Sequence, residues 1–209
     1  MAKQPSSPDQ PPLQVAIADK SPLIQAALNH LISEDPRFQL QAVCGDGEEL
    51  LEIIEATDLD VVVTGWVMPP GDGRYVLDHL KATESAPRVV VYTGAEGEMV
   101  PSLVMAHGGA AFVSKSEQPH YLLDTIADVG QGKMVFPFLD VKRIHDNPLT
   151  GLTNRELEVL SSLAAGRTNK EIARELGVSA NTVKYHVRNL YQKLRVKNRG
   201  QAIGLYLKS

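Results

Sequence analysis

The chain has 209 residues, of which 43% are hydrophobic and 22% charged, and it contains one cysteine. This length allows one or two domains with a buried core, and the composition is ordinary for a globular protein. A single cysteine excludes an internal disulfide framework and offers no metal-ligand spacing, and the longest apolar runs are far too short to cross a bilayer. We therefore expect a cytoplasmic protein without a membrane partner.

The formal net charge of -4 conceals two parts of opposite sign. Residues 1–148 carry 10 Lys and Arg against 21 Asp and Glu, whereas residues 149–209 carry 11 against 4. A basic module beside an acidic one is typical of a polyanion binder with a regulatory partner domain. Chance clustering of charge on a solvated surface is the alternative, and charge alone does not decide between the two.

The first part of the chain has the pattern of an α/β domain. Residues 1–12 lack the apolar core of a secretory signal, and we expect a disordered extension there. Over residues 13–130, short β-branched runs alternate with stretches of helical periodicity. The expected strands are Gln14–Ala18, Gln39–Cys44, Asp60–Thr64, Arg88–Thr93 and Ala111–Ser114. The expected helices are Pro22–Ile32, Gly47–Ala56, Gly73–Lys81, Met99–Ala106 and Pro119–Val129. This alternation predicts a doubly wound, five-stranded parallel sheet with functional groups at the carboxyl ends of its strands.

The last part has the pattern of a small helical domain. Residues 131–148 hold Gly, Pro and mixed charge with little periodicity, so we expect a linker there. Two capping-box patterns then begin helices: Thr153 with Glu156, and Thr168 with Glu171. Gly177 lies in a turn before a longer basic helix that Ser179 can cap, and a fourth helix covers about residues 199–207. This order predicts an all-α, four-helix domain of the helix-turn-helix type over residues 149–209.

The third of these helices carries two kinds of face. Its apolar residues recur at spacings of 4, 3 and 4 and are expected in the core: Val183, Val187, Leu190 and Leu194. Other faces supply the donors and the apolar edge that major-groove reading uses: Asn181, Lys184, Tyr185 and Arg188. Further side chains are better placed for phosphates: Lys170, Thr182, Lys193, Arg195, Lys197 and Arg199. The alternative is a solvated amphipathic helix, which the two capped helices in front disfavour.

Residues 150–206 resemble the LuxR/FixJ-type DNA-binding domain in the motifs LT-x-RE-x-EVL, NKEIA, TVK-x-H and KL-x-V. The resemblance implies recognition-helix contacts at Lys184, Tyr185 and Arg188. It also implies a homodimer seam on the last helix, for which packing within the monomer is the alternative: Ala202, Ile203, Leu205 and Tyr206. The implied partner is double-stranded DNA with a palindromic or half-site operator, and RNA polymerase is a further candidate partner.

Residues 13–130 resemble a receiver domain of the NarL/FixJ response regulators in the loop MPPGDG and the strands VVVYT and AAFVSK. The resemblance implies an acceptor carboxylate after the third strand, an acidic pair that holds Mg²⁺, a lysine, a hydroxyl and a switch aromatic. On this sequence the last three fall on Lys115, Thr93 and Phe112. The acidic pair becomes Asp19 and Lys20, and the acceptor position falls on Gly65.

These replacements predict a degenerate receiver. Glycine has no nucleophile, and strand alternation turns the neighbouring Thr64 to the opposite face of the sheet. We expect no Mg²⁺ site and no cofactor, because an ion pair of Asp19 with Lys20 and Lys115 would replace the metal. The chain is then an orphan, atypical response regulator that acts without aspartyl phosphorylation and without a cognate histidine kinase. The alternative is a conventional two-component regulator with a non-standard acceptor.

The input to such a receiver is left open by the sequence. It could serve for dimerisation through residues 99–107 and 119–130, bind a ligand beside Gly65, or use Trp66 as an anchor for a protein; packing is the other role for Trp66. The six histidines have no catalytic or metal spacing, and no phosphate-cradling loop follows a strand, so we predict no enzyme. An adaptor without DNA binding is disfavoured by the basic third helix. The prediction is a sequence-specific DNA-binding transcription regulator.

Overall fold

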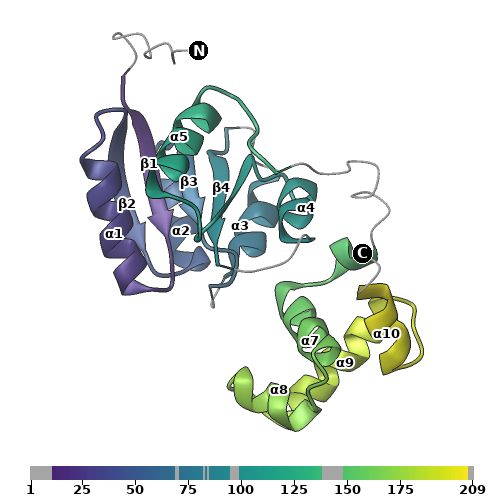
Figure 1. The fold of residues 1–209 in the computed structure, drawn as a ribbon. Coiled ribbons are helices and arrows are strands. Elements are labelled where there is room, and N and C mark those ends of the chain that lie inside the picture. The colour runs from purple at the N-terminus through teal and green to yellow at the C-terminus, as the bar shows by residue number, and fades with distance from the viewer. Residues whose placement is uncertain are drawn as a thin grey trace. The chain divides into compact units, whose positions relative to one another are not determined.

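The computed structural model describes residues 11–68, 71–81, 83, 85–94, 99–137 and 148–206. The chain divides into two compact units after Pro137. The first unit is a five-stranded sheet in the order β2-β1-β3-β4-β5, with every neighbouring pair parallel. Its strands are β1 (Leu13–Ala18), β2 (Phe38–Cys44), β3 (Val61–Thr64), β4 (Arg88–Thr93) and β5 (Ala111–Ser114). This confirms the predicted doubly wound α/β fold (Figure 1).

Helices cover both faces of this sheet (Figure 1). They are α1 (Pro22–Ser33), α2 (Gly47–Ala56), α3 (Gly73–Leu80), α4 (Met99–Ala106) and α5 (Pro119–Gly130). On one face, Leu28 and Ile32 of α1 and Ile126 of α5 join one core cluster with the strands. Every residue of β3 is buried, because this central strand is covered on both sides. That burial explains why β3 is a run of three valines before Thr64 instead of an alternating pattern.

The strand order places the candidate site. The chain leaves β1 towards β2 and leaves β3 towards β4, so the connections diverge between β1 and β3. Ligands of open α/β sheets bind in the crevice that such a divergence opens at the carboxyl ends of the strands. Asp19 directly follows β1, Gly65 directly follows β3, and Lys115 directly follows β5. The topology therefore gathers at one edge residues that lie far apart in the sequence.

Part of the predicted linker belongs with the first unit. Val135 forms an isolated parallel bridge with Ala111, donating its N–H to the carbonyl of Ala110 at 3.0 Å and accepting the N–H of Phe112 at 3.0 Å. These bonds satisfy backbone groups at the free edge of β5. The rest of the predicted linker, residues 138–147, and residues 1–10 of the predicted N-terminal extension lie outside the described residues.

The second unit contains the 3₁₀ turn η1 (Pro148–Gly151) and the helices α7 (Asn154–Ala164), α8 (Asn169–Glu175), α9 (Ala180–Lys193) and α10 (Arg199–Tyr206). Both predicted capping boxes are present, and the Ser179 hydroxyl accepts the N–H of Thr182. Val159, Leu163, Ile172 and Val183 join α7, α8 and α9 in one core. Within the described ranges, no helix of either unit has the length and apolarity needed to cross a membrane.

Candidate functional site

The carboxyl edge of the sheet holds an ion pair between a buried carboxylate and a partly exposed ammonium. Asp19 is 2% exposed, and its Oδ2 accepts a hydrogen bond from the ammonium of Lys115. The other oxygen, Oδ1, accepts the backbone N–H of Ser21 at 2.9 Å. The Lys115 ammonium also lies 5.6 Å from the centre of the Tyr92 ring. The predicted pairing of Asp19 with Lys115 is therefore present, and both carboxylate oxygens have protein donors.

Gly65 lies beside this pair, and the side chain of Met68 packs against it. A Cβ added to Gly65 would come 3.0 Å from Met68 Cγ, 3.1 Å from Met68 Sδ and 3.5 Å from Asp19 Oδ2. Met68 is fully buried, and the Thr64 hydroxyl contacts its sulfur at 3.9 Å. Met68 thus occupies much of the space that the sequence suggested for a ligand beside Gly65. No pattern in the sequence predicted this contact, because methionine fills irregular gaps without a characteristic spacing.

The residues present do not fit a divalent cation. Magnesium needs several oxygen ligands, and of the positions implied by the resemblance only Asp19 carries a carboxylate. That carboxylate holds the ammonium of Lys115. Lys20 is exposed and, within the described residues, forms no ion pair with Asp19, contrary to expectation. Among the described residues, no group of three or more His, Cys, Asp or Glu side chains is arranged to hold a metal.

Other predicted members of the pocket are in place but covered. Thr93 ends β4 and is 4% exposed, and Phe112 in β5 is half-buried. Trp66 is 3% exposed. The burial of Trp66 favours its packing role over a surface anchor for a protein partner.

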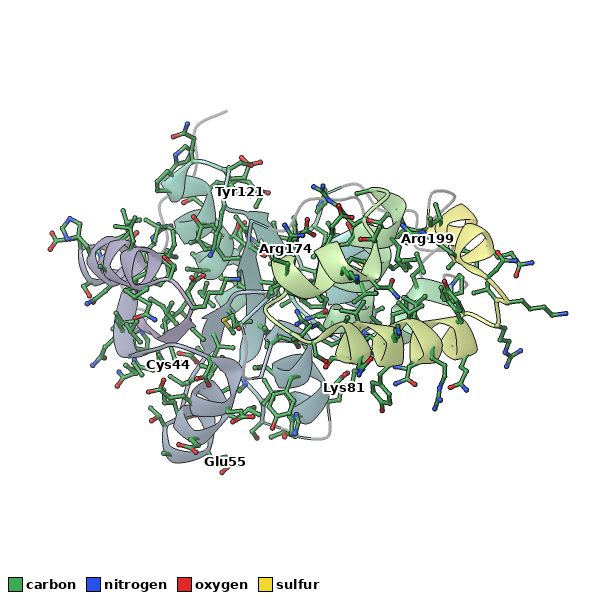
Figure 2. All side chains as sticks on the ribbon, turned by 90° about the horizontal axis from the view of Figure 1, so that it is seen from below. Cys44, Glu55, Lys81, Tyr121, Arg174 and Arg199 are labelled. Atoms are coloured by element: carbon green, nitrogen blue, oxygen red, sulfur yellow. The ribbon has the colours of Figure 1, made fainter. Side chains whose placement is uncertain are left out.

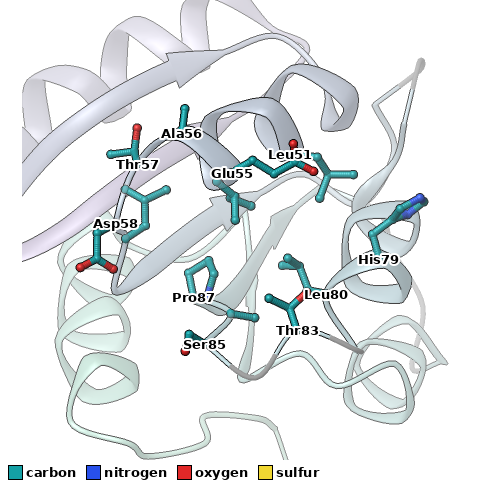
Figure 3. Close-up of a pocket in the computed structure, with 13 residues that line it drawn as sticks. Leu51, Glu55, Ala56, Thr57, Asp58, His79, Leu80, Thr83, Ser85 and Pro87 are labelled. Atoms are coloured by element: carbon teal, nitrogen blue, oxygen red, sulfur yellow. The ribbon is translucent and has the colours of Figure 1, made fainter.

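A separate cavity of about 420 Å³ lies at the opposite edge of the sheet (Figure 3). Its lining comes from the end of α2, the end of α3 and the segments that enter β3 and β4, including Glu55, Asp58, His79 and Pro87. These residues precede the strands, whereas Asp19 and Gly65 follow them. The cavity therefore does not belong to the Asp19–Lys115 site.

In the second unit, α9 presents the predicted base-reading side chains to solvent. Asn181, Lys184 and Arg188 are exposed, and Tyr185 is 58% exposed. The opposite side of α9 is held in the core by Val183 and Leu190, which are both fully buried, as predicted. Side chains project from α9 on the side away from α8 (Figure 2). This arrangement gives a protruding helix with two cations, an amide and an aromatic ring on one exposed surface.

The predicted phosphate contacts divide into free and engaged side chains. Lys170 and Arg195 are exposed, whereas the hydroxyl of Thr182 is hydrogen-bonded to Ser179 at 2.8 Å as part of the helix cap. Lys193 instead donates to Glu156 Oε2 at 2.7 Å. Arg199 donates from Nη2 to the carbonyls of Leu163 and Arg167, at 2.8 and 2.9 Å (Figure 2 labels Arg199). These last two cations thus form bonds within the helical unit, and their phosphate contacts stay a prediction.

Glu156 is the functional side chain whose second role the sequence did not reveal. It is 3% exposed, and its Oε2 accepts both the Thr153 N–H at 2.8 Å and the Lys193 ammonium. Burial by itself would raise the pKa of Glu156, but the bonds from Lys193 and Thr153 outweigh it and leave that pKa below its ordinary value. The capping-box pattern predicted the bond to Thr153. Nothing in the local spacing indicated Lys193.

Arg195 has a left-handed backbone, with φ of 54°, directly after the end of α9. This conformation costs a residue with a Cβ about 1–2 kcal/mol, and glycine avoids that cost. We expect Arg195→Gly to raise the free energy of unfolding of the helical unit by about 0.5–1 kcal/mol, measured by urea denaturation. The same change should weaken binding to every duplex alike, with a salt slope smaller by about 0.9.

Arg195→Ala is the matched control, since it removes the same charge but keeps the Cβ. It should weaken DNA binding as much as Arg195→Gly while leaving the unfolding free energy close to that of the native protein. Equal stability of the two variants would contradict the strain argument. Unaltered DNA affinity in both variants would show that Arg195 does not contact a phosphate.

The last helix is divided between the domain core and its surface. Ala202 is fully buried, and Ile203 packs against the core of α7, α8 and α9. Leu205 and Tyr206 are half-buried. Ala202 and Ile203 therefore make contacts of the kind that the monomer-packing alternative expects, and the dimer seam stays a prediction. Leu205 and Tyr206 retain surface that a dimer seam could use.

A parallel α/β unit with a site at its carboxyl edge, followed by a helix-turn-helix unit, defines the class of two-domain transcription regulators. Comparisons with known proteins agree. Residues 15–127 match the model described as response regulator receiver domain, and residues 150–206 match the model described as bacterial regulatory proteins, luxR family.

Full-length relatives share both parts. The probable transcriptional regulatory protein SgaR of Hyphomicrobium methylovorum is 36% identical over 93% of this chain and 92% of its own length. The nitrate/nitrite response regulator protein NarP of Escherichia coli (strain K12) is 31% identical over 96% and 97%. A solved structure of RcsB dimers bound to two parallel DNAs is 25% identical, covers 95% of this chain and 98% of that one, and has a TM-score of 0.58. The chain belongs to the response regulators with a luxR-family DNA-binding domain.

Proposed function

We propose that this DNA-binding transcriptional regulator acts without aspartyl phosphorylation and without a cognate histidine kinase. The observation that carries the proposal is the absence of any side chain at Gly65, next to the Asp19–Lys115 pair. A phosphoryl acceptor needs a nucleophilic oxygen at this position, and glycine supplies none. The acyl phosphate would also need Mg²⁺ to offset its charge, and the donor set beside Gly65 does not fit that ion.

Neighbouring carboxylates are poor substitutes for the missing acceptor. Asp72 accepts the N–H of Tyr75 at 2.9 Å as the cap of α3. Asp60 precedes β3, at the edge of the sheet away from Gly65, and accepts the N–H of Gln14 at 2.7 Å. Each of these carboxylates is therefore committed to a structural bond. The Asp19–Lys115 pair remains as an internal substitute for the lost metal site.

The test is incubation of the whole protein with Mg²⁺ and a small phosphodonor, followed by mass spectrometry. We expect an unchanged mass. The comparison variant Lys20→Asp/Gly65→Asp restores the two absent carboxylates; Met68 must shift by a few tenths of an ångström to admit the new Cβ. Gain of one phosphoryl group by the native chain, on a carboxylate near Gly65, would instead support a conventional regulator with a non-standard acceptor.

We further propose that α9 makes the sequence-specific contacts and that the chain binds DNA as a homodimer. The exposed side chains Lys184, Tyr185 and Arg188 support the first part, since they offer donors and an apolar edge of the kind that major-groove contacts use. The solved RcsB dimers on DNA support the second. Selection of bound fragments from random DNA should return a motif with two half-sites about one helical turn, or a multiple of it, apart. Motifs without a repeated half-site would contradict dimeric recognition.

A further inference from the structure

The end of the recognition helix is tied to the beginning of α7 by one buried carboxylate. Lys193 is the last residue of α9, and its ammonium lies 2.7 Å from Oε2 of Glu156. The side chain of Glu156 is 4% exposed, whereas that of Lys193 is 40% exposed. The same oxygen accepts the N–H of Thr153, the residue that caps α7. Glu156 Oε2 thus takes part in the N-terminal capping box of α7 and also binds the C-terminal residue of α9.

This tie acts on the helix at a distance from its exposed reading surface. Asn181, Lys184 and Arg188 lie in the first two-thirds of α9, which has 14 residues and is about 20 Å long. Val183 and Leu190 hold the helix in the core, and Lys193 adds a polar contact beyond them. A base-edge hydrogen bond weakens steeply when its distance or angle departs from the favoured range, so a small tilt of α9 alters every base contact together.

The Lys193 charge is already neutralised within the domain. The Glu156 carboxyl is ionised at neutral pH, since its pKa lies below the ordinary value. Removal of Lys193 would leave that carboxylate buried without its cation, which is costly to a fold. A lysine paired in this way releases few counterions on DNA binding, in contrast to Lys170, which forms no ion pair within the described residues.

We propose that Lys193 and Glu156 are positioning residues that set the angle of α9 in the major groove, and that Lys193 acts through the helix and not on a phosphate. This inference rests on DNA reading by α9. It predicts a loss of specificity, and not of general affinity, when the pair is broken. A phosphate contact would give the reverse result.

The test measures dissociation constants of the full chain for its selected operator and for an unrelated duplex, over a series of salt concentrations. For Lys193→Met we expect operator affinity to fall about fivefold or more, with the affinity for the unrelated duplex and the salt slope nearly unchanged. Lys193→Arg keeps a cation for Glu156 and should restore most of the operator affinity. Lys170→Met is the matched control, and it should weaken both duplexes alike and reduce the slope by about 0.9.

A second variant separates positioning from folding. In Glu156→Gln/Lys193→Met no charge is stranded, and glutamine can still serve in the capping box. We expect this variant to regain the thermal stability that Lys193→Met loses, while the ratio of operator to non-operator affinity stays low. A native ratio in the double variant, or a slope reduced by about 0.9 in Lys193→Met, would overturn the inference. If the native chain itself shows no preference for its operator, the proposed DNA reading by α9 is wrong. That result differs from the two outcomes that would overturn the positioning role alone.

Discussion

Alanine at Lys184 or at Arg188 is expected to weaken binding to the selected operator by roughly 1–3 kcal/mol for each substitution. Both side chains are exposed on α9, and neither forms an ion pair within the described residues. Their donors are therefore available to base edges, where one good bidentate contact discriminates against the wrong base by a similar amount. The measurement is a titration of labelled operator and of an unrelated duplex at fixed salt.

Lys133→Ala is the matched control for this prediction. It removes one positive charge from an exposed side chain of the first unit, where Lys133 pairs with Asp128 at 2.7 Å. Surface pairs of this kind contribute little, so operator affinity should stay within about twofold. Native operator affinity in both α9 variants would contradict the assignment of this helix as the reading element. An equal loss of affinity for both duplexes would indicate that Lys184 and Arg188 contact phosphates instead of bases.

Leu163→Ala is expected to lower the free energy of unfolding of the helical unit by about 2–5 kcal/mol. Leu163 is 1% exposed and belongs to the core that joins α7, α8 and α9. A unit of this size has a margin of only several kcal/mol, so DNA binding should be lost over much of the physiological temperature range. The measurement is thermal unfolding followed by circular dichroism and by tryptophan fluorescence.

The single tryptophan makes this experiment selective. Trp66 is buried in the first unit, so its fluorescence reports that unit alone, whereas circular dichroism reports the helices of both. We expect a lower transition in the dichroism and an unchanged one in the fluorescence. Leu23→Ala serves as the control, because Leu23 is 78% exposed and its truncation should cost less than about 0.5 kcal/mol. A fluorescence transition that moves with the dichroism would contradict independent unfolding of the two units.

Several basic residues of the second unit form bonds within that unit. Arg155 donates to the carbonyl of Leu176 at the end of α8 at 3.0 Å, and Arg199 donates to the carbonyl of Leu163 in α7. Lys193 holds Glu156. Helix ends carry carbonyls without intrahelical partners, and guanidinium groups satisfy them with favourable charge. The positive charge of residues 149–209 therefore overstates the number of side chains that are free to meet DNA.

Features with a local cause could be predicted from sequence. The capping boxes at Thr153 and Thr168 depend on residues three positions apart, and the structure has both. The strands and helices of the first unit begin and end within a residue or two of their predicted bounds, because β-branched runs and helical periodicity are short-range patterns. The glycine at position 65, which offers no side-chain nucleophile, is likewise readable from one position of the chain.

Contacts between distant residues required the tertiary structure. Met68 meets Gly65, and Glu156 meets Lys193, only because a particular loop and a particular pair of helices pack together. The sequence predicted a receiver-like sheet with glycine at the implied acceptor position, and a helix-turn-helix unit with a basic third helix. The tertiary structure determined which basic side chains of that unit form intramolecular bonds. A hydrogen bond needs two polar atoms within about 3 Å of each other, and no spacing along the chain encodes that distance for residues far apart in sequence.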